Sequence, residues 1–207
     1  SLIVGGSFVS KFQPDQDPFL ELPENVGIWA GRANYVSAKR NLYSEYAYKI
    51  NDPNGSNGNI YKPGQALMAN ATYSVRGLGI SAGAHIFDNM VFQSDRGAPT
   101  LFDLNINYLP TLAKQHTYNL PATLYPYATQ PNGEVAYQGE VFYKFKRGSK
   151  LGGKYGTKIS ANWSGAWSLD TTGMKGCGYI AEVVVRDRTI VASQGQGWVR
   201  SASVGFC

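Results

Sequence analysis

Apolar and polar residues alternate one by one along several segments of about ten residues. In the segment 78–86, for example, Leu78, Ile80 and Ile86 share one parity, and small or polar residues occupy the other. Successive side chains of a strand point to opposite faces, so this period of two predicts a β-strand. The same alternation recurs in 42–50, 67–75, 102–108, 117–124, 135–146 and 158–167, and two earlier segments, 2–12 and 26–38, fit it less cleanly. We therefore expect an all-β chain with about nine strands by residue 168.

The connections between these segments alternate in length. Short reversals at 38–41 and 76–78 separate longer linkers that are rich in proline, aspartate and asparagine. Tight turns on one side and longer loops on the other are typical of an up-and-down transmembrane β-barrel. The pattern predicts an antiparallel up-and-down meander of about 9–12 strands, which forms a transmembrane β-barrel or an incomplete part of one.

A soluble secreted β-sandwich would also alternate, and it would bind a ligand or glycan through aromatic, Asn-rich loops. Two features favour the barrel. The alternating segments are long enough to cross a bilayer at a tilt, whereas soluble strands average about five or six residues. Aromatic residues such as Tyr43, Tyr125, Trp163 and Trp167 also gather near segment ends, where interfacial girdles would place them.

Composition narrows the function classes. The chain has 207 residues, of which 43% are hydrophobic, 13% aromatic and 16% charged; this low charge and high aromatic content argue against disorder and against a helical bundle. The net charge is +5, but glycines interrupt the basic stretches, so we expect no nucleic-acid partner. Whether Cys177 and Cys207 pair is left open, as is the oligomeric state.

Catalytic and metal-binding motifs are not expected. His85 and His116 are about 30 positions apart and are interpreted as ordinary strand or turn residues. The segment 52–59 superficially resembles a calcium loop, but it has one carboxylate and no closing glutamate, which favours an Asn/Gly-rich turn. No phosphate-binding loop or GxSxG motif is present. We therefore expect neither an enzyme nor a cofactor or metal.

The polar parity supplies candidates for the lining of a barrel lumen. These candidates are Arg32, Glu45, Lys49, Asn70, Asn105, Asn107, Lys144, Lys146, Lys158 and Asn162. Basic side chains outnumber acidic ones among them, which would favour anions or small polar solutes in a pore. The alternative is a packed interior in which these charges pair with one another.

Several local strings carry a resemblance to a known family. They are GGSFVSKFQ (5–13), LPENVG (22–27), YSEYAYKINDP (43–53), KPGQAL (62–67), KQHTYNL (114–120) and, most specifically, ATLYPYATQPNGE (122–134). Over about residues 1–172 the chain resembles an uncharacterised outer-membrane β-barrel family of gut anaerobes, known only as a domain of unknown function. The resemblance implies the outer membrane of a Gram-negative bacterium, contact with outer-membrane lipid, and a porin-like transport or surface-scaffold role without a defined substrate.

The resemblance also suggests a division of the chain. Residues 1–172 are expected to form a β-barrel segment of about nine strands, and because family members are longer, this segment would be an incomplete barrel. Residues 173–207 are expected to be divergent C-terminal strands or an out-of-family tail, including a frame-shifted end. The residues 183–185 can still form a strand there.

Overall fold

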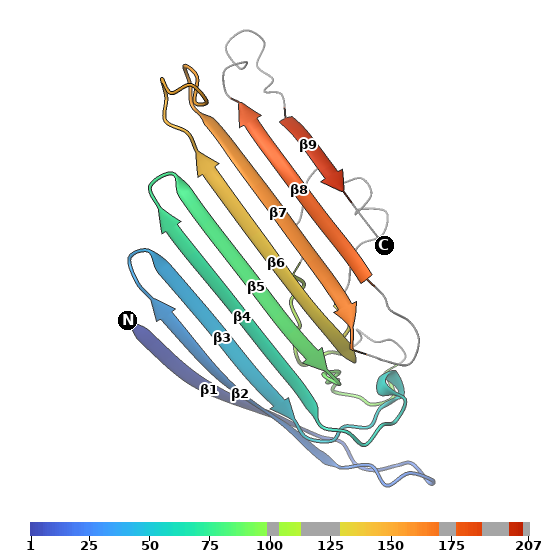
Figure 1. Cartoon of the computed structure of the whole chain (residues 1–207). Helices are drawn as coiled ribbons and strands as arrows, with labels where there is room; N and C mark the ends of the chain where they lie inside the picture. The colour runs from blue at the N-terminus through green and yellow to red at the C-terminus, as the bar shows by residue number, and fades with distance from the viewer. Residues whose placement is uncertain (99–103, 113–128, 170–176, 188–198, 205–207) are drawn as a thin grey trace.

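The computed structural model describes residues 1–98, 104–112, 129–169, 177–187 and 199–204. Among them, nine strands form one sheet in chain order, and each strand pairs antiparallel with the next (Figure 1). The strands are β1 (Leu2–Phe12), β2 (Asn25–Val36), β3 (Arg40–Lys49), β4 (Gly64–Val75), β5 (Leu78–Asp88), β6 (Gly133–Lys144), β7 (Thr157–Ser168), β8 (Cys177–Asp187) and β9 (Val199–Val204). The predicted all-β antiparallel meander is confirmed, with β1 and β9 as the two edges of an open sheet.

The connections lie at two ends of the sheet and differ in length (Figure 1). At the short-turn end, β2 continues into β3 and β4 into β5 through two or three residues, and β6 continues into β7 through residues 145–156. At the long-loop end, residues 13–24, 50–63 and 89–132 connect β1 to β2, β3 to β4 and β5 to β6. Gly77 adopts φ 88° in the tight β4–β5 turn, a conformation that glycine accepts without steric cost.

The segment predicted as a strand over 102–108 is not one in its described part, residues 104–108. Leu104 has φ 54°, and Asn105 forms only an isolated bridge with Gln93. The Ile106 amide donates to the Phe92 carbonyl, so this stretch runs beside residues 92–94 instead of joining the sheet. The prediction was wrong because apolar and polar residues alternate from 104 to 108 as they do in a strand, although this stretch does not join the sheet.

Two further predictions concern the later part of the chain. The predicted strand over 117–124 lies outside the described residues, as does His116. In the region after residue 172, β8 pairs with β7 and β9 with β8. The short stretch 183–185 that the sequence marks as a possible strand lies within β8.

Residues paired across antiparallel strands point to the same side of the sheet. Because apolar residues are paired mainly with apolar ones, the sheet has one apolar and one polar face. In β4, for example, Leu67, Ala69 and Ala71 point to one side and Met68 and Asn70 to the other. The apolar face is formed by residues that include Leu2, Trp29, Tyr46, Leu67, Ile86, Val135, Val141 and Trp163. The polar face is formed by residues that include Arg32, Glu45, Asn70, Ser81, Gln138 and Asn162.

The buried core lies on the polar face, near the long-loop end. It joins Val26, Ile28, Ala66 and Phe87 of the sheet to Met90 and Phe92 of the β5–β6 connection. A short 3-10 helix, η1 (Gly55–Asn57), lies in the β3–β4 connection at the same end. The hydrophobic core therefore lies between the sheet and its own loops.

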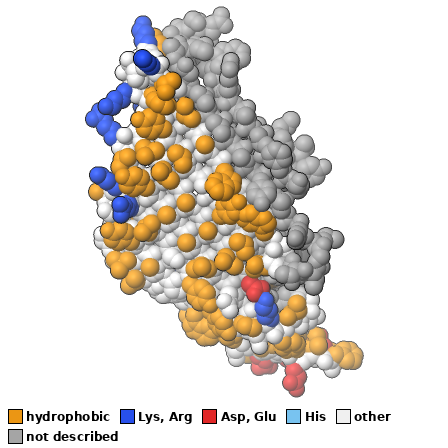
Figure 2. Space-filling model, viewed as in Figure 1, with side chains coloured by type: hydrophobic (Ala, Val, Ile, Leu, Met, Phe, Trp, Pro, Cys, Tyr) orange, Lys and Arg blue, Asp and Glu red, His pale blue; other side chains and the backbone are white. Residues whose placement is uncertain are grey.

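The apolar face is the exposed one. Trp29 is 48% exposed, Leu67 41% and Trp163 51%, and Figure 2 shows hydrophobic side chains spread over the strands of this face. Soluble monomers rarely expose a contiguous apolar patch larger than a few hundred Å².

Among the residues that the structure describes, no helix has the length and apolarity needed to span a membrane.

Candidate functional site

A part of the β5–β6 connection folds back onto the polar face; we call residues 89–98 and 104–112 the folded-in segment. Two lysines of the sheet hold its backbone. Lys49, at the end of β3, is fully buried and donates from Nζ to the Val91 carbonyl. Lys11, near the end of β1, donates to the Gln93 carbonyl over 2.8 Å. Buried ammonium groups need such partners, since an unpaired buried charge is costly.

Asp52 is the buried carboxylate that pairs with the cations Lys11 and Arg96 of this region. It is fully buried, and its Oδ2 lies 2.8 Å from the Lys11 Nζ. Its Oδ1 lies 3.7 Å from the Arg96 Nε, and the Arg96 guanidinium also donates to the Pro23 carbonyl. One carboxylate thus links β1, the β3–β4 connection and the folded-in segment.

His85 and Glu134 form a second buried pair on the polar face. The His85 Nε2 lies 2.6 Å from the Glu134 Oε1, and both side chains are buried. The other carboxylate oxygen of Glu134 accepts from the Gln130 amide over 2.7 Å. The His85 ring stacks on Phe87 with centroids 4.1 Å apart. The pair therefore fixes the chain just before β6 to β5.

The segment 52–59 is a turn cluster, as its asparagine and glycine content predicts. Asn54 caps η1 by accepting from the Asn57 amide. Asn57 in turn donates to the Asn89 Oδ1 over 2.9 Å, and Asn89 donates to the Lys62 carbonyl. The cluster ties the β3–β4 connection to the start of the folded-in segment. Among the residues described, no group of three or more His, Cys, Asp or Glu side chains is placed to hold a metal ion.

The folded-in segment reaches the middle of the polar face. Asn107 donates to the Met90 carbonyl over 2.7 Å, which keeps the two halves of the segment together. A Cβ atom on Gly83 of β5 would lie 3.1 Å from a methyl carbon of Leu112, so Leu112 rests on the sheet there. The polar face is therefore covered from the long-loop end to about mid-strand by this segment.

The lumen candidates from the sequence fall into three groups. Arg32, Glu45, Asn70, Lys144, Lys158 and Asn162 lie on the polar face, spread from β2 to β7. Lys49 also lies there, but it is buried under the folded-in segment. Lys146 follows the end of β6, and Asn105 and Asn107 belong to the folded-in segment instead of a strand.

Some of the polar-face candidates are neighbours. Arg32 is paired with Glu45 across β2 and β3, and the Tyr43 hydroxyl donates to the same carboxylate. Lys144 is paired with Lys158 across β6 and β7, and the Lys158 Nζ lies 4.7 Å from the Phe142 ring centroid. Asn162 is buried. The candidates therefore form a dispersed polar lining and not one compact site.

Sequence reasoning missed the residues that join the connections to the sheet at the long-loop end, namely Lys11, Asp52, Arg96 and Glu134. A signal for Lys11 exists, because it occupies the polar parity at the long-loop end of its strand, as the candidate Lys49 does. Asp52 and Arg96 lie in connections, where alternation says nothing about burial. Their roles depend on contacts between loops far apart in the chain.

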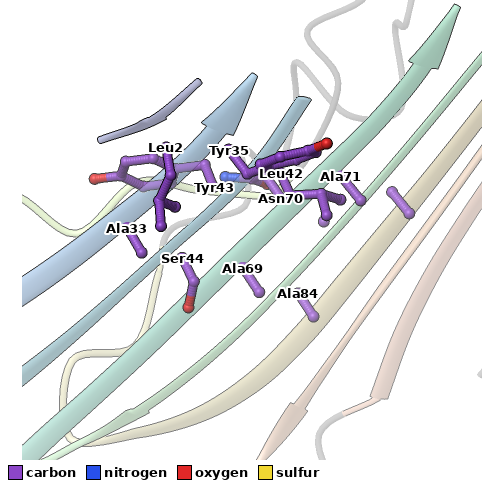
Figure 3. A pocket seen from close by; sticks show the side chains of 12 residues that line it. Leu2, Ala33, Tyr35, Leu42, Tyr43, Ser44, Ala69, Asn70, Ala71 and Ala84 are labelled. Atoms are coloured by element: carbon purple, nitrogen blue, oxygen red, sulfur yellow. The ribbon is translucent and has the colours of Figure 1, made fainter. Parts of the chain in front are cut away.

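The apolar face carries a shallow hollow of about 470 Å³. Small side chains form it, among them Ala33, Ser44, Ala69 and Ala84, which occupy neighbouring positions on β2 to β5 (Figure 3). Leu2 and Leu42 lie beside them. Small side chains therefore occupy this part of the apolar face, on β2 to β5.

Comparison with known proteins identifies the family. No curated protein and no solved structure matches the chain significantly. The model of a family of unknown function, DUF6029, matches residues 1–190, a range that continues beyond residue 172, to which the sequence resemblance extends. Because this match covers most of the chain, the protein belongs to the family of unknown function DUF6029.

Proposed function

We propose that this sheet is part of the wall of an outer-membrane β-barrel, with a porin-like transport or surface-scaffold role. The apolar face contacts lipid, and the polar face lines the interior. The observation that carries the proposal is the uncovered apolar face opposite a polar face that carries the protein's own core. A water-soluble fold would bury its apolar face first, because burial of apolar surface is the main driving force of folding.

The strands have the dimensions that a bilayer requires. The seven strands from β1 to β7 each span 10 to 12 residues, whereas a strand tilted in a bilayer needs about 9–11. Their connections alternate between tight turns and long loops, as in known transmembrane barrels.

Aromatic side chains on the apolar face flank the small residues of its centre. Towards the long-loop end, the Trp29 ring lies 5.4 Å from the Phe8 ring and 6.4 Å from the Tyr48 ring, between centroids. Tyr35 and Tyr143 lie towards the short-turn end, and each is nearly half exposed. Amphipathic rings of this kind favour the two membrane–water interfaces.

The interior of the proposed barrel is narrowed by the folded-in segment. Lys49, Lys11 and the Asp52 network hold this segment against the wall. The uncovered part of the polar face presents Arg32, Lys144 and Lys158 at its surface, so the solutes admitted would be small and polar or anionic.

Two biochemical readouts test the proposal on the protein in its native membrane. It is expected to enter the detergent phase on phase separation, and to migrate differently on gels before and after boiling. Recovery in the aqueous phase with no heat-dependent mobility would point to the soluble sandwich, whose second layer would have to cover the apolar face. Single-channel conductance in planar bilayers then separates a pore from a closed scaffold.

A further inference from the structure

The short-turn end of the sheet carries a rim of basic side chains that the proposed wall does not by itself explain. The rim is formed by three turns and includes Lys39, Arg40, Arg76, Lys146, Arg147 and Lys150, all of them exposed. The segments 37–41, 74–80 and 142–160, which form these turns and their flanks, contain no aspartate or glutamate. Figure 2 shows these basic side chains along one end of the apolar face.

Among the residues whose side chains the structure describes, no acidic side chain forms an ion pair with this rim. None of the rim side chains takes part in the ion pairs Lys11–Asp52, Arg96–Asp52, Lys62–Asp88 and His85–Glu134, which lie at the long-loop end or on the polar face near it. The long-loop end carries the opposite charge, with exposed Asp15, Asp17, Glu21 and Glu24 in the β1–β2 connection. The two ends of the sheet are therefore electrostatically different, as the red and blue side chains of Figure 2 show.

The rim is continuous with the apolar face. Tyr35, Tyr73 and Tyr143 lie on that face within two residues of the ends of β2, β4 and β6, and the basic side chains follow in or directly beside the turns. If the tyrosines lie at the level of the headgroups, the lysines and arginines reach the phosphate layer just outside it. Juxtamembrane basic clusters bind the anionic lipids of a leaflet in this way.

We propose that the basic rim binds the headgroups of anionic phospholipids, and that this contact fixes the short-turn end to the leaflet that contains them. The inference rests on the proposed membrane location and adds the chemistry of the lipid and the orientation of the sheet. The acidic long-loop end would be repelled by the same lipids, so both ends favour one orientation.

The test uses the full chain and two kinds of vesicle, phosphatidylcholine alone and phosphatidylcholine with one quarter phosphatidylglycerol. Membrane association is measured by flotation after transfer from denaturant. The rim variant combines Lys39→Gln, Arg40→Gln and Arg76→Gln. The control variant makes the same change in net charge at the long-loop end, with Gln16→Glu, Asn25→Asp and Lys62→Gln.

We expect the native chain to associate more strongly with the anionic vesicles, and this preference to disappear at high salt. The preference of the rim variant for anionic vesicles should fall roughly fivefold for each charge removed, and the control should lose much less of it, because its changes lie away from the bound headgroups. Equal association of the native chain with both vesicles, or equal losses in both variants, would overturn the rim proposal while leaving the barrel intact. A chain that floats with neither vesicle would overturn the barrel and the rim together.

Discussion

Asp52 is the residue on which the arrangement of the long-loop end depends most. It is fully buried, and it faces both Lys11 and Arg96. Removing such a carboxylate destabilises the fold, because the two cations would then share a buried site without a counter-charge. Lys62 and Asp88 form an ion pair at the same end of the sheet, but their side chains are 51% and 32% exposed.

The substitution Asp52→Ala tests this difference. We expect it to lower the free energy of unfolding by about 3–5 kcal/mol, since it leaves a buried charge unpaired. Asp88→Ala is the matched control, for which an exposed pair predicts a loss of at most about 1 kcal/mol. Denaturant unfolding followed by tryptophan fluorescence measures both. Similar losses in the two variants would contradict the role assigned to Asp52.

The β1–β2 connection contains a carboxylate that responds to pH. The amides of Leu22 and Asp17 donate to Asp15 and hold the pKa of its carboxyl below the usual value. A group whose pKa is lowered in the folded state stabilises that state above its unfolded pKa, and the stabilisation is lost as pH falls through the folded pKa.

We therefore expect the loop 13–24 to be ordered at neutral pH and to loosen below about pH 4. Nuclear magnetic resonance shifts of the Leu22 amide, followed during an acid titration, measure the change. Asp15→Asn should abolish the titration of this amide. If the amide titrates unchanged in the variant, its pH response comes from another group.

At the scale of the element, neighbouring residues of β4 lie on opposite faces of the sheet, one proposed to contact lipid and the other to line the interior. Ala71 lies on the apolar face and Asn70 on the polar face, near the middle of the strand. In a barrel wall these two positions face lipid and the interior, although they are adjacent in the chain.

Arginine at each position makes a matched pair of variants. Ala71→Arg should impair insertion by about 2–4 kcal/mol if the position is near the bilayer midplane. Asn70→Arg should insert almost normally, because the interior accepts charge. Folding yield into phosphatidylcholine vesicles, titrated with urea, measures the two. The assignment of faces is wrong if Asn70→Arg is the more damaging change.

The elements also show how far the sequence predicts this fold. A period of two identifies β1 to β7 because the two faces of the sheet differ so strongly, and it places Arg32, Glu45 and Asn70 on the polar face. It fails at 102–108, where the same alternation occurs in the folded-in segment.

The position of the core could not be read from the sequence. Alternation assigns Lys11 and Lys49 to the polar face, where a solvated side chain would be expected. In the structure, loops from distant parts of the chain bury both lysines and accept hydrogen bonds from them. Such contacts depend on the three-dimensional placement of the connections, which local periodicity does not encode.

At the scale of the whole molecule, the sheet has an exposed apolar face, which Figure 2 shows, an opposite polar face, and two ends of opposite charge. The low overall charge and the many aromatic residues follow from this division. In β1 to β7, alternate residues place mainly apolar side chains on the exposed face and mainly polar ones on the other, so the mean hydropathy of the chain stays near neutral. The central claim is that the uncovered half contacts lipid.

The most direct test labels the residues of β4 from 67 to 72 one at a time with a nitroxide, in a chain whose Cys177 and Cys207 are changed to Ser. Collision rates with oxygen, which concentrates in lipid, and with a polar nickel complex are measured in reconstituted vesicles. We predict that Leu67, Ala69 and Ala71 respond to oxygen, and that Met68, Asn70 and Thr72 favour the nickel complex wherever the folded-in segment leaves them open. Low collision rates with both reagents at positions 67, 69 and 71 would mean that another protein layer covers the apolar face, and this result would contradict the membrane wall.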